Sequence, residues 1–125
     1  MTAEIIKKLK ANKEVIIATD FDDTLVEAKQ FPKFGKPTPW FHVAKKLQEN
    51  FPKLKLILWT CREGKYLESA ITFCHQNGLM FDAINSDVPS SIKWKVKTRK
   101  PFAHIYVDDR NLDIKSAVFL RKLVK

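Results

Sequence analysis

Short apolar runs alternate along this chain with segments in which apolar residues recur at helical spacing. Such runs are typical of buried strands, and the recurring pattern is typical of amphipathic helices. The pattern predicts strands at residues 15–19, 53–59, 80–84 and 103–107. It predicts helices at residues 2–11, 39–50 and 64–77, and from residue 112 to the end of the chain.

The residues between these elements indicate where each begins and ends. Thr38 followed by Pro39 is a typical helix start, and Gly78 suits the left-handed backbone that ends a helix. Residues 21–37 contain prolines and a glycine, which predict a loop or a small hairpin. Residues 86–99 are polar and basic without a helical period, so we expect a loop or an extended ribbon there.

The order of these elements predicts an α/β fold. Strands that are joined by helices form a parallel sheet with right-handed crossovers and helices on both faces. No repeat, low-complexity tract or linker divides the chain. We therefore expect a single three-layer, Rossmann-like domain over residues 1–125.

Polar residues that could carry out chemistry follow the predicted strands. Asp20 and Asp22 follow the first strand, Thr60 follows the second, and Asp108 and Asp109 follow the fourth. Ligands of open parallel sheets bind at the carboxyl ends of the strands, so we expect these side chains at one edge. Clustered carboxylates repel one another unless a cation lies among them, and hard oxygen ligands suit Mg²⁺. The pattern therefore predicts a magnesium site.

Two carboxylates that are two positions apart can divide the work of a hydrolysis. One can attack as a nucleophile while the other transfers protons. A lysine and a hydroxyl group nearby would stabilise the charge on a transferring phosphoryl group. A single aspartate at a strand end is usually a turn or cap residue, but the joint pattern favours a phosphoryl-transfer site.

Four segments of the chain resemble the motifs of the haloacid dehalogenase-like phosphohydrolases, in that family's order. The family's motifs are a hydrophobic strand followed by Asp-x-Asp-x-Thr, a threonine or serine that closes the next strand, a lysine, and an acidic pair that closes a later strand. The matching residues here are Asp20, Asp22 and Thr24, then Thr60, then Lys100, then Asp108 and Asp109. Residues 58–64 and 99–111 are especially similar to small bacterial or phage-type members.

The resemblance implies a two-step phosphatase reaction. Asp20 would attack phosphorus to form an aspartyl-phosphate, and Asp22 would protonate the leaving group and then activate water. Thr60 and Lys100 would bind the phosphoryl oxygens. The implied ligands of Mg²⁺ are the Asp20 carboxylate, the Asp22 backbone carbonyl, Asp108 and Asp109. Dehalogenating members of the family lack the second aspartate, so Asp22 favours phosphoryl chemistry.

The identity of the phosphate-binding lysine stays open. Lys93, Lys95 and Lys97 lie in the same connection as Lys100 and could supply the ammonium group instead. Together with Arg99 they alternate along residues 92–99, which would place four cations on one face of an extended ribbon. That face could grip a phosphate backbone, or it could be a solvated sheet edge that resists association.

Three further residues next to the motifs are expected to contact the substrate. They are Thr24, Cys61 and Arg62. Arg62 could reach a second phosphate or a carboxylate of the substrate, and the alternative is an ion pair with Glu63 or Glu27.

The spacing of the motifs leaves room for a minimal cap at most. Only residues 25–59 separate the first motif from the second, and a helix and a strand use most of them. Residues 27–37 would form a short flap. An uncapped site accepts a large substrate, such as a nucleic-acid end or a phosphoprotein, or needs a neighbouring subunit to exclude water. Small phosphate esters stay open as substrates.

The charge of the chain adds two alternative functions. Lys and Arg number 23 against 14 Asp and Glu, for a net charge of +9. Such a charge attracts phosphates, nucleic acids and anionic lipid head groups. One alternative is a phosphatase that acts on 3′-phosphorylated nucleic-acid ends. The other is a non-catalytic module on the same fold that binds nucleic acid or a partner.

Several classes of protein are unlike this sequence. Its apolar runs are far shorter than the roughly 20 residues of a membrane span, and residues 1–14 alternate apolar and charged positions, unlike a secretory signal. The chain has 2 cysteines, and their spacing indicates neither a disulfide framework nor a zinc site. We expect a cytoplasmic protein that does not associate with membranes.

Overall fold

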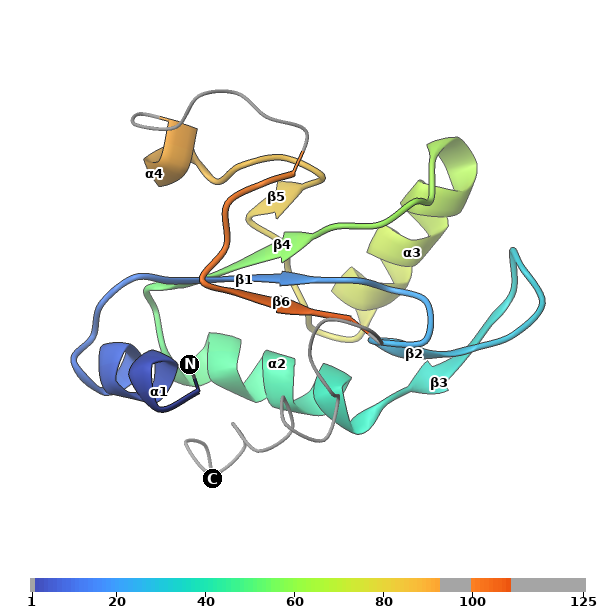
Figure 1. Cartoon of the computed structure of the whole chain (residues 1–125). Helices are drawn as coiled ribbons and strands as arrows, with labels where there is room; N and C mark the ends of the chain where they lie inside the picture. The colour runs from blue at the N-terminus through green and yellow to red at the C-terminus, as the bar shows by residue number, and fades with distance from the viewer. Residues whose placement is uncertain (1, 93–99, 109–125) are drawn as a thin grey trace.

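The computed structural model describes residues 2–92 and 100–108 of the chain (Figure 1). A parallel sheet of four strands lies at its centre, in the order β5-β4-β1-β6. The strands are β1 (Val15–Thr19), β4 (Leu54–Leu58), β5 (Ala83–Ile84) and β6 (Ile105–Val107). The predicted α/β fold with a Rossmann-like parallel sheet is confirmed.

The described helices flank this sheet. They are α1 (Thr2–Lys10), α2 (Pro39–Asn50), α3 (Gly64–Gln76) and α4 (Pro89–Ile92). In Figure 1, α1 and α2 lie below the sheet and α4 lies above it. The first three helices begin and end within one residue of the predicted bounds, and the helix predicted from residue 112 lies outside the described residues. In the part of the chain that the structure describes, no helix is long and apolar enough to span a membrane.

Strand β1 is buried along its whole length because it has a neighbour on each side and packed residues on both faces. Successive residues of the strand face opposite sides of the sheet. Ile17 belongs to the larger core, which includes residues of α1, α2 and α3. Ile16 and Ala18 face a second core with Val88 and Ala103. The continuous apolar run in the sequence reflects burial on both faces.

Strand β4 loses one residue at each end of its predicted range, and β5 and β6 begin later than predicted because side chains take the place of backbone partners at their starts. The Leu56 N–H donates to Oδ2 of Asp82 at 2.8 Å, and the Ile16 N–H donates to Nδ1 of His104 at 2.9 Å. These bonds occupy the donors that would otherwise bind backbone carbonyls. Strand β5 therefore begins at residue 83 rather than 80, and β6 begins at residue 105 rather than 103.

Helix α4 is a correction to the prediction of a loop or ribbon over residues 86–99. The Val88 carbonyl accepts hydrogen bonds from the Ser91 N–H at 2.9 Å and the Ile92 N–H at 3.3 Å, which closes one turn of helix. A helix of 4 residues is too short to show a helical period in the sequence. Residues 93–99, where the four alternating cations were predicted, lie outside the described residues.

The segment after β1 contains the small hairpin that was one of the two predicted outcomes. Strands β2 (Val26–Ala28) and β3 (Phe34–Pro37) pair in antiparallel fashion. A Cβ atom on Gly35 would lie 2.9 Å from Cβ of Glu27, so only glycine allows this close approach without a shift. Thr38 is the N-cap residue as predicted, but its side-chain oxygen accepts no N–H from the first turn of α2. The Thr38 hydroxyl instead donates to the Thr24 carbonyl at 2.6 Å. This bond ties the start of α2 to the turn after β1.

Candidate active site

A cavity of about 630 Å³ lies at the carboxyl ends of β1, β4 and β6. Four residues predicted to have catalytic or metal-binding roles line it, namely Asp20, Thr60, Lys100 and Asp108. Its other lining residues, among those described, are Ala18, Trp59, Cys61, Glu63, Asn85, Tyr106 and Val107. Residues that are up to 90 positions apart in the sequence thus meet in one space, as the rule for parallel sheets predicts.

Asp20 lies at the exit of β1, directly beside β6. Its N–H donates to the Val107 carbonyl at 3.0 Å, which extends the pairing of the two strands by one position. The next residue after Val107 is Asp108, so both carboxylates are carried by neighbouring strand ends. The Oδ1 atom of Asp20 accepts a hydrogen bond from the Phe21 N–H at 2.7 Å. This bond fixes the orientation of the carboxylate at the cavity.

Thr60 is held in place by a residue that the sequence analysis did not identify. Asn85 follows β5 with a left-handed φ of 51° and lines the same cavity. Its Oδ1 accepts a hydrogen bond from the Thr60 N–H at 2.8 Å, and its own N–H donates to the Leu58 carbonyl at 2.7 Å. Asparagine tolerates this backbone conformation better than most residues. A polar residue just after the third predicted strand was the signal that could have identified it.

Lys100 is positioned by two aromatic rings. Its Nζ lies 4.1 Å from the ring centroid of Tyr106 and 5.2 Å from that of Trp59. Aromatic faces attract cations, so these rings hold the ammonium group at the cavity wall. The Tyr106 hydroxyl donates to the Pro101 carbonyl at 2.7 Å, which fixes the ring. The structure thus supplies Lys100 as a cation of the cavity, whereas the alternative lysines lie outside the described residues.

Asp22 and Arg62 form an ion pair instead of lining the cavity. Arg62 Nε donates to Oδ2 of Asp22 and Nη2 donates to Oδ1, both at 2.7 Å. The expectation that Arg62 reaches the substrate is wrong for this arrangement, because the residue is only 3% exposed. The alternative pairing with Glu63 or Glu27 is also wrong, since the partner is Asp22.

Thr24, a second expected substrate contact, does not line the cavity either. It is fully buried, and its hydroxyl has no hydrogen-bond partner among the described residues. The reason is the tight turn that follows β1, in which the Phe21 carbonyl accepts the N–H groups of Thr24, Leu25 and Val26 at 3.2, 2.9 and 3.2 Å. This turn carries the Thr24 side chain into the core. Cys61, the third expected contact, is exposed and lines the cavity.

The donor set of the cavity fits a magnesium ion. Asp20 and Asp108 supply carboxylate oxygens from adjacent strand ends, and Mg²⁺ in proteins is often bound by one or two carboxylates with several waters. Within residues 2–92 and 100–108 there is no group of three or more His, Cys, Asp or Glu side chains that could hold a metal. The fourth predicted ligand, Asp109, lies outside the described residues. Of the predicted carboxylate ligands, Asp20 and Asp108 therefore line the described cavity.

Comparison with known proteins gives one informative match. No protein-family model matches the chain, and no curated protein matches it. A solved structure of a conserved protein from Bacteroides thetaiotaomicron is 35% identical, over 89% of this chain and 90% of that chain, with a TM-score of 0.70. The similarity in sequence and fold extends over nearly the full length of both chains.

Proposed function

We propose that this chain, which belongs to the family of the conserved Bacteroides thetaiotaomicron protein, is a magnesium-dependent phosphatase that acts on a phosphomonoester. The observation that carries the proposal is the convergence of Asp20, Thr60, Lys100 and Asp108 on one cavity. A carboxylate, a hydroxyl and an ammonium group in that arrangement can attack and stabilise a phosphoryl group. The resemblance of the same residues to the haloacid dehalogenase-like motifs supports this reaction.

In the first step, an Asp20 carboxylate oxygen attacks phosphorus and the bond from phosphorus to the leaving oxygen breaks. Asp22 is two residues from Asp20 and does not line the cavity itself, so its partly exposed carboxyl group would donate a proton to the part of the substrate that extends out of the cavity. Asp20 becomes an aspartyl-phosphate. The Thr60 hydroxyl and the Lys100 ammonium group bind the phosphoryl oxygens and stabilise their charge. The Phe21 N–H bond to Asp20 Oδ1 holds the nucleophile in position for this attack.

In the second step, Asp22 takes a proton from a water molecule that attacks phosphorus. The bond between phosphorus and the Asp20 oxygen breaks, which releases inorganic phosphate and restores both aspartates. Asp20 and Asp108 would hold Mg²⁺, with the Asp22 backbone carbonyl as a third ligand. When bound, the ion neutralises phosphoryl charge and reduces repulsion between the nucleophile and its substrate.

The proposal is tested by phosphate release from a panel of sugar phosphates, nucleotides, aryl phosphates and phosphorylated oligonucleotides, with and without Mg²⁺. We expect magnesium-dependent release by the wild type and a loss of at least about 10³-fold in Asp20→Asn, because the nucleophile is gone. Asp23→Asn is the matched control, since Asp23 is exposed, has a left-handed φ of 59° and does not line the cavity. Its activity should match that of the wild type.

The proposal would be contradicted if the wild type released phosphate from none of the substrates, or if Asp20→Asn kept full activity. Tight oligonucleotide binding by both the wild type and Asp20→Asn, with no phosphate release, would instead favour a non-catalytic binding module. In that case the protein would have the same fold but would not be an enzyme.

The net charge of +9 favours nucleic-acid ends as a second candidate substrate within the same reaction. Binding to a polyanion releases counterions, so turnover of a 3′-phosphorylated oligonucleotide should weaken steeply as salt rises. Hydrolysis of an aryl phosphate by the same protein serves as the control, because it has no polyanionic backbone. Equal salt dependence of the two substrates, or activity confined to small phosphates, would reject this candidate.

A further inference from the structure

The Arg62 guanidinium is enclosed by aromatic rings and by the hairpin of β2 and β3. Its Cζ atom lies 5.1 Å from the ring centroid of Phe21, 5.0 Å from that of Phe31 and 5.4 Å from that of Phe34. Nη2 also donates to the Pro32 carbonyl at 3.2 Å. The side chain is only 2% exposed. Three rings and a backbone carbonyl therefore restrict the guanidinium to one position.

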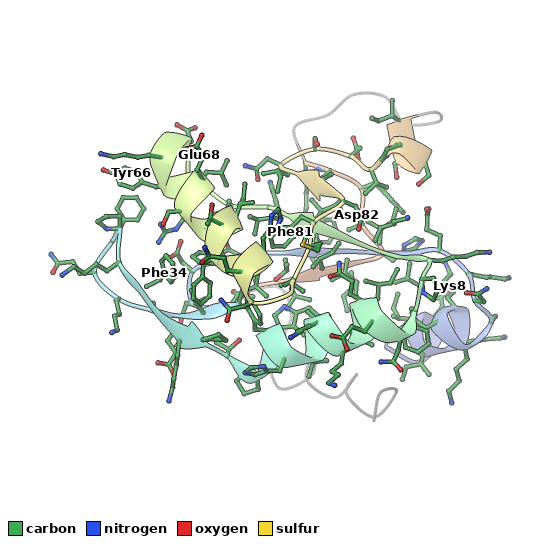
Figure 2. The ribbon with its side chains drawn as sticks, turned by 180° about the vertical axis from the view of Figure 1, so that it is seen from behind. Lys8, Phe34, Tyr66, Glu68, Phe81 and Asp82 are labelled. Atoms are coloured by element: carbon green, nitrogen blue, oxygen red, sulfur yellow. The ribbon has the colours of Figure 1, made fainter. Side chains whose placement is uncertain are left out.

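The hairpin that encloses Arg62 is itself fixed by contacts with α3. The Phe31 and Tyr66 ring centroids are 5.0 Å apart, and those of Phe34 and Phe73 are also 5.0 Å apart. Figure 2 shows Phe34 on the side of the hairpin that faces α3, and Tyr66 at the start of that helix. Arg62 thus lies where the hairpin, the turn before α3 and the turn after β1 meet.

Arg62 also has a direct link to the cavity through the backbone. Its N–H donates to Oγ1 of Thr60 at 3.2 Å, and Thr60 lines the cavity. The two 2.7 Å bonds from its side chain then reach Asp22. The residue that would bind the phosphoryl group and the residue that would transfer the proton are therefore both bonded to Arg62.

The bidentate geometry sets the direction of the Asp22 carboxylate. A planar guanidinium that binds both oxygens fixes the plane of the carboxylate as well as its distance, whereas a single bond would allow rotation. Each carboxylate oxygen has two lone pairs, and Arg62 uses one on each. The Asp22 side chain is 37% exposed, so its remaining lone pairs can exchange a proton with a substrate or a water molecule.

We infer that Arg62 is a positioning residue, which holds the Asp22 carboxylate in the orientation needed for proton transfer through its bidentate contact. This inference rests on the proposed function. It assigns to Arg62 a role in the reaction that needs no contact with substrate, in agreement with its burial. Loss of Arg62 should therefore slow both proton transfers that Asp22 assists, and leave substrate binding nearly unchanged.

The test compares two substrates that differ in their need for an acid. p-Nitrophenyl phosphate has a good leaving group, whereas glycerol phosphate has a poor one that must be protonated. We expect Arg62→Gln and Arg62→Lys to lower the first-turnover rate of leaving-group release by about 10-fold or more for glycerol phosphate, and by much less for p-nitrophenyl phosphate. Hydrolysis of the aspartyl-phosphate, which Asp22 also assists, should slow equally after either substrate, so the first turnover is measured and not kcat. Lysine keeps the charge but cannot form the bidentate contact. Arg62→Lys therefore provides the decisive result if Arg62→Gln does not fold.

A double-mutant cycle checks that Arg62 acts through Asp22. The Arg62→Lys, Asp22→Asn double variant should be no slower than Asp22→Asn alone, within about threefold. The carboxylate that Arg62 positions is already absent from Asp22→Asn, so the loss of Arg62 has no further effect on proton transfer. Lys65→Gln is the matched control, since Lys65 is an exposed cation on the same segment and does not line the main cavity. Its kinetics should match those of the wild type with both substrates.

The outcomes separate this inference from the proposed function. Equal losses of the first-turnover rate on both substrates, which add in full to the loss in Asp22→Asn, would show that Arg62 only supports the fold. That result would overturn the inference while the phosphatase proposal stands. A selective loss on glycerol phosphate that is absent from the double variant supports it. A wild type that hydrolyses neither substrate overturns the proposed function and this inference together.

Discussion

The two cysteines lie in opposite environments, which gives each a different reactivity. Cys61 is exposed and lines the cavity, whereas Cys74 is fully buried in the core between α3 and the sheet. Burial raises the pKa of the Cys74 thiol from 9.0 to about 12, because a thiolate there would lose its hydration. Only thiolates react readily with disulfide reagents.

We therefore predict that a disulfide reagent modifies one thiol per native chain at pH 8, and both thiols after unfolding. Cys61→Ser should abolish the reaction of the native protein with the reagent. Attachment of a bulky group to Cys61 should lower phosphate release by the wild type, because the group would fill the cavity. Titration of two thiols in the native protein, or of one in native Cys61→Ser, would be inconsistent with the buried position of Cys74.

At the residue scale, the sequence predicted positions better than it predicted contacts. Asp20 and Thr60 were correctly expected at one sheet edge because each directly follows a strand whose apolar run is easily recognised. The pairing of Asp22 with Arg62 was not expected. It joins residues 40 positions apart and depends on how two turns and the hairpin pack, which no local pattern encodes.

Among the elements, the junction of β1 and β6 depends on the protonation state of one side chain. The imidazole Nδ1 of His104 accepts a hydrogen bond from the Ile16 backbone N–H at 2.9 Å. The backbone N–H of His104 donates to the Ile16 carbonyl at 2.8 Å. Nδ1 can accept this bond only while it carries no proton. Burial lowers the pKa of His104 below its usual 6.5, and the charge on Lys8 lowers it further, against opposing effects of Glu14 and Glu4.

This arrangement predicts a loss of stability in mild acid. The folded-state pKa of His104 is depressed, so the unfolded chain takes up a proton first as the pH falls. The contribution is fully present above pH 6.5 and is lost as the pH falls from there through the folded-state pKa. Urea unfolding between pH 5 and 8 should show this decline. His104→Asn keeps an acceptor near the Nδ1 position, but asparagine does not titrate. The free energy of unfolding of this variant should therefore decline less than that of the wild type as the pH falls. An equal decline in both proteins would reject this role of His104.

The elements differ in how far local sequence determines them. Strand β1 and helix α2 were predicted accurately, because a continuous apolar run and a proline at a helix start are local signals. The starts of β5 and β6 were not, because Asp82 and His104 replace backbone acceptors from across the sheet. Helix α4 is too short to produce a period. Errors thus fall where tertiary contacts override local preference.

At the scale of the whole molecule, the topology turns four separate sequence motifs into one site. Strand β1 lies between β4 and β6, so the residues that follow these three strands necessarily share an edge. Asp20, Thr60 and Asp108 meet there, and Lys100 reaches them from the segment that leads into β6. This convergence follows from parallel strand order and could be predicted. The contacts of Asn85 with Thr60 and of Arg62 with Asp22 depend on how loops pack, and no local pattern predicts them.

The proposed reaction depends on covalent phosphorylation of Asp20, which chemical trapping can detect. Borohydride reduces an aspartyl-phosphate to homoserine, which peptide sequencing by mass spectrometry can locate. During turnover of p-nitrophenyl phosphate with Mg²⁺, we expect homoserine at position 20 in the wild type and in Asp23→Asn, and none without substrate. Rapid phosphate release with an unmodified Asp20, or with homoserine at another aspartate, would contradict it.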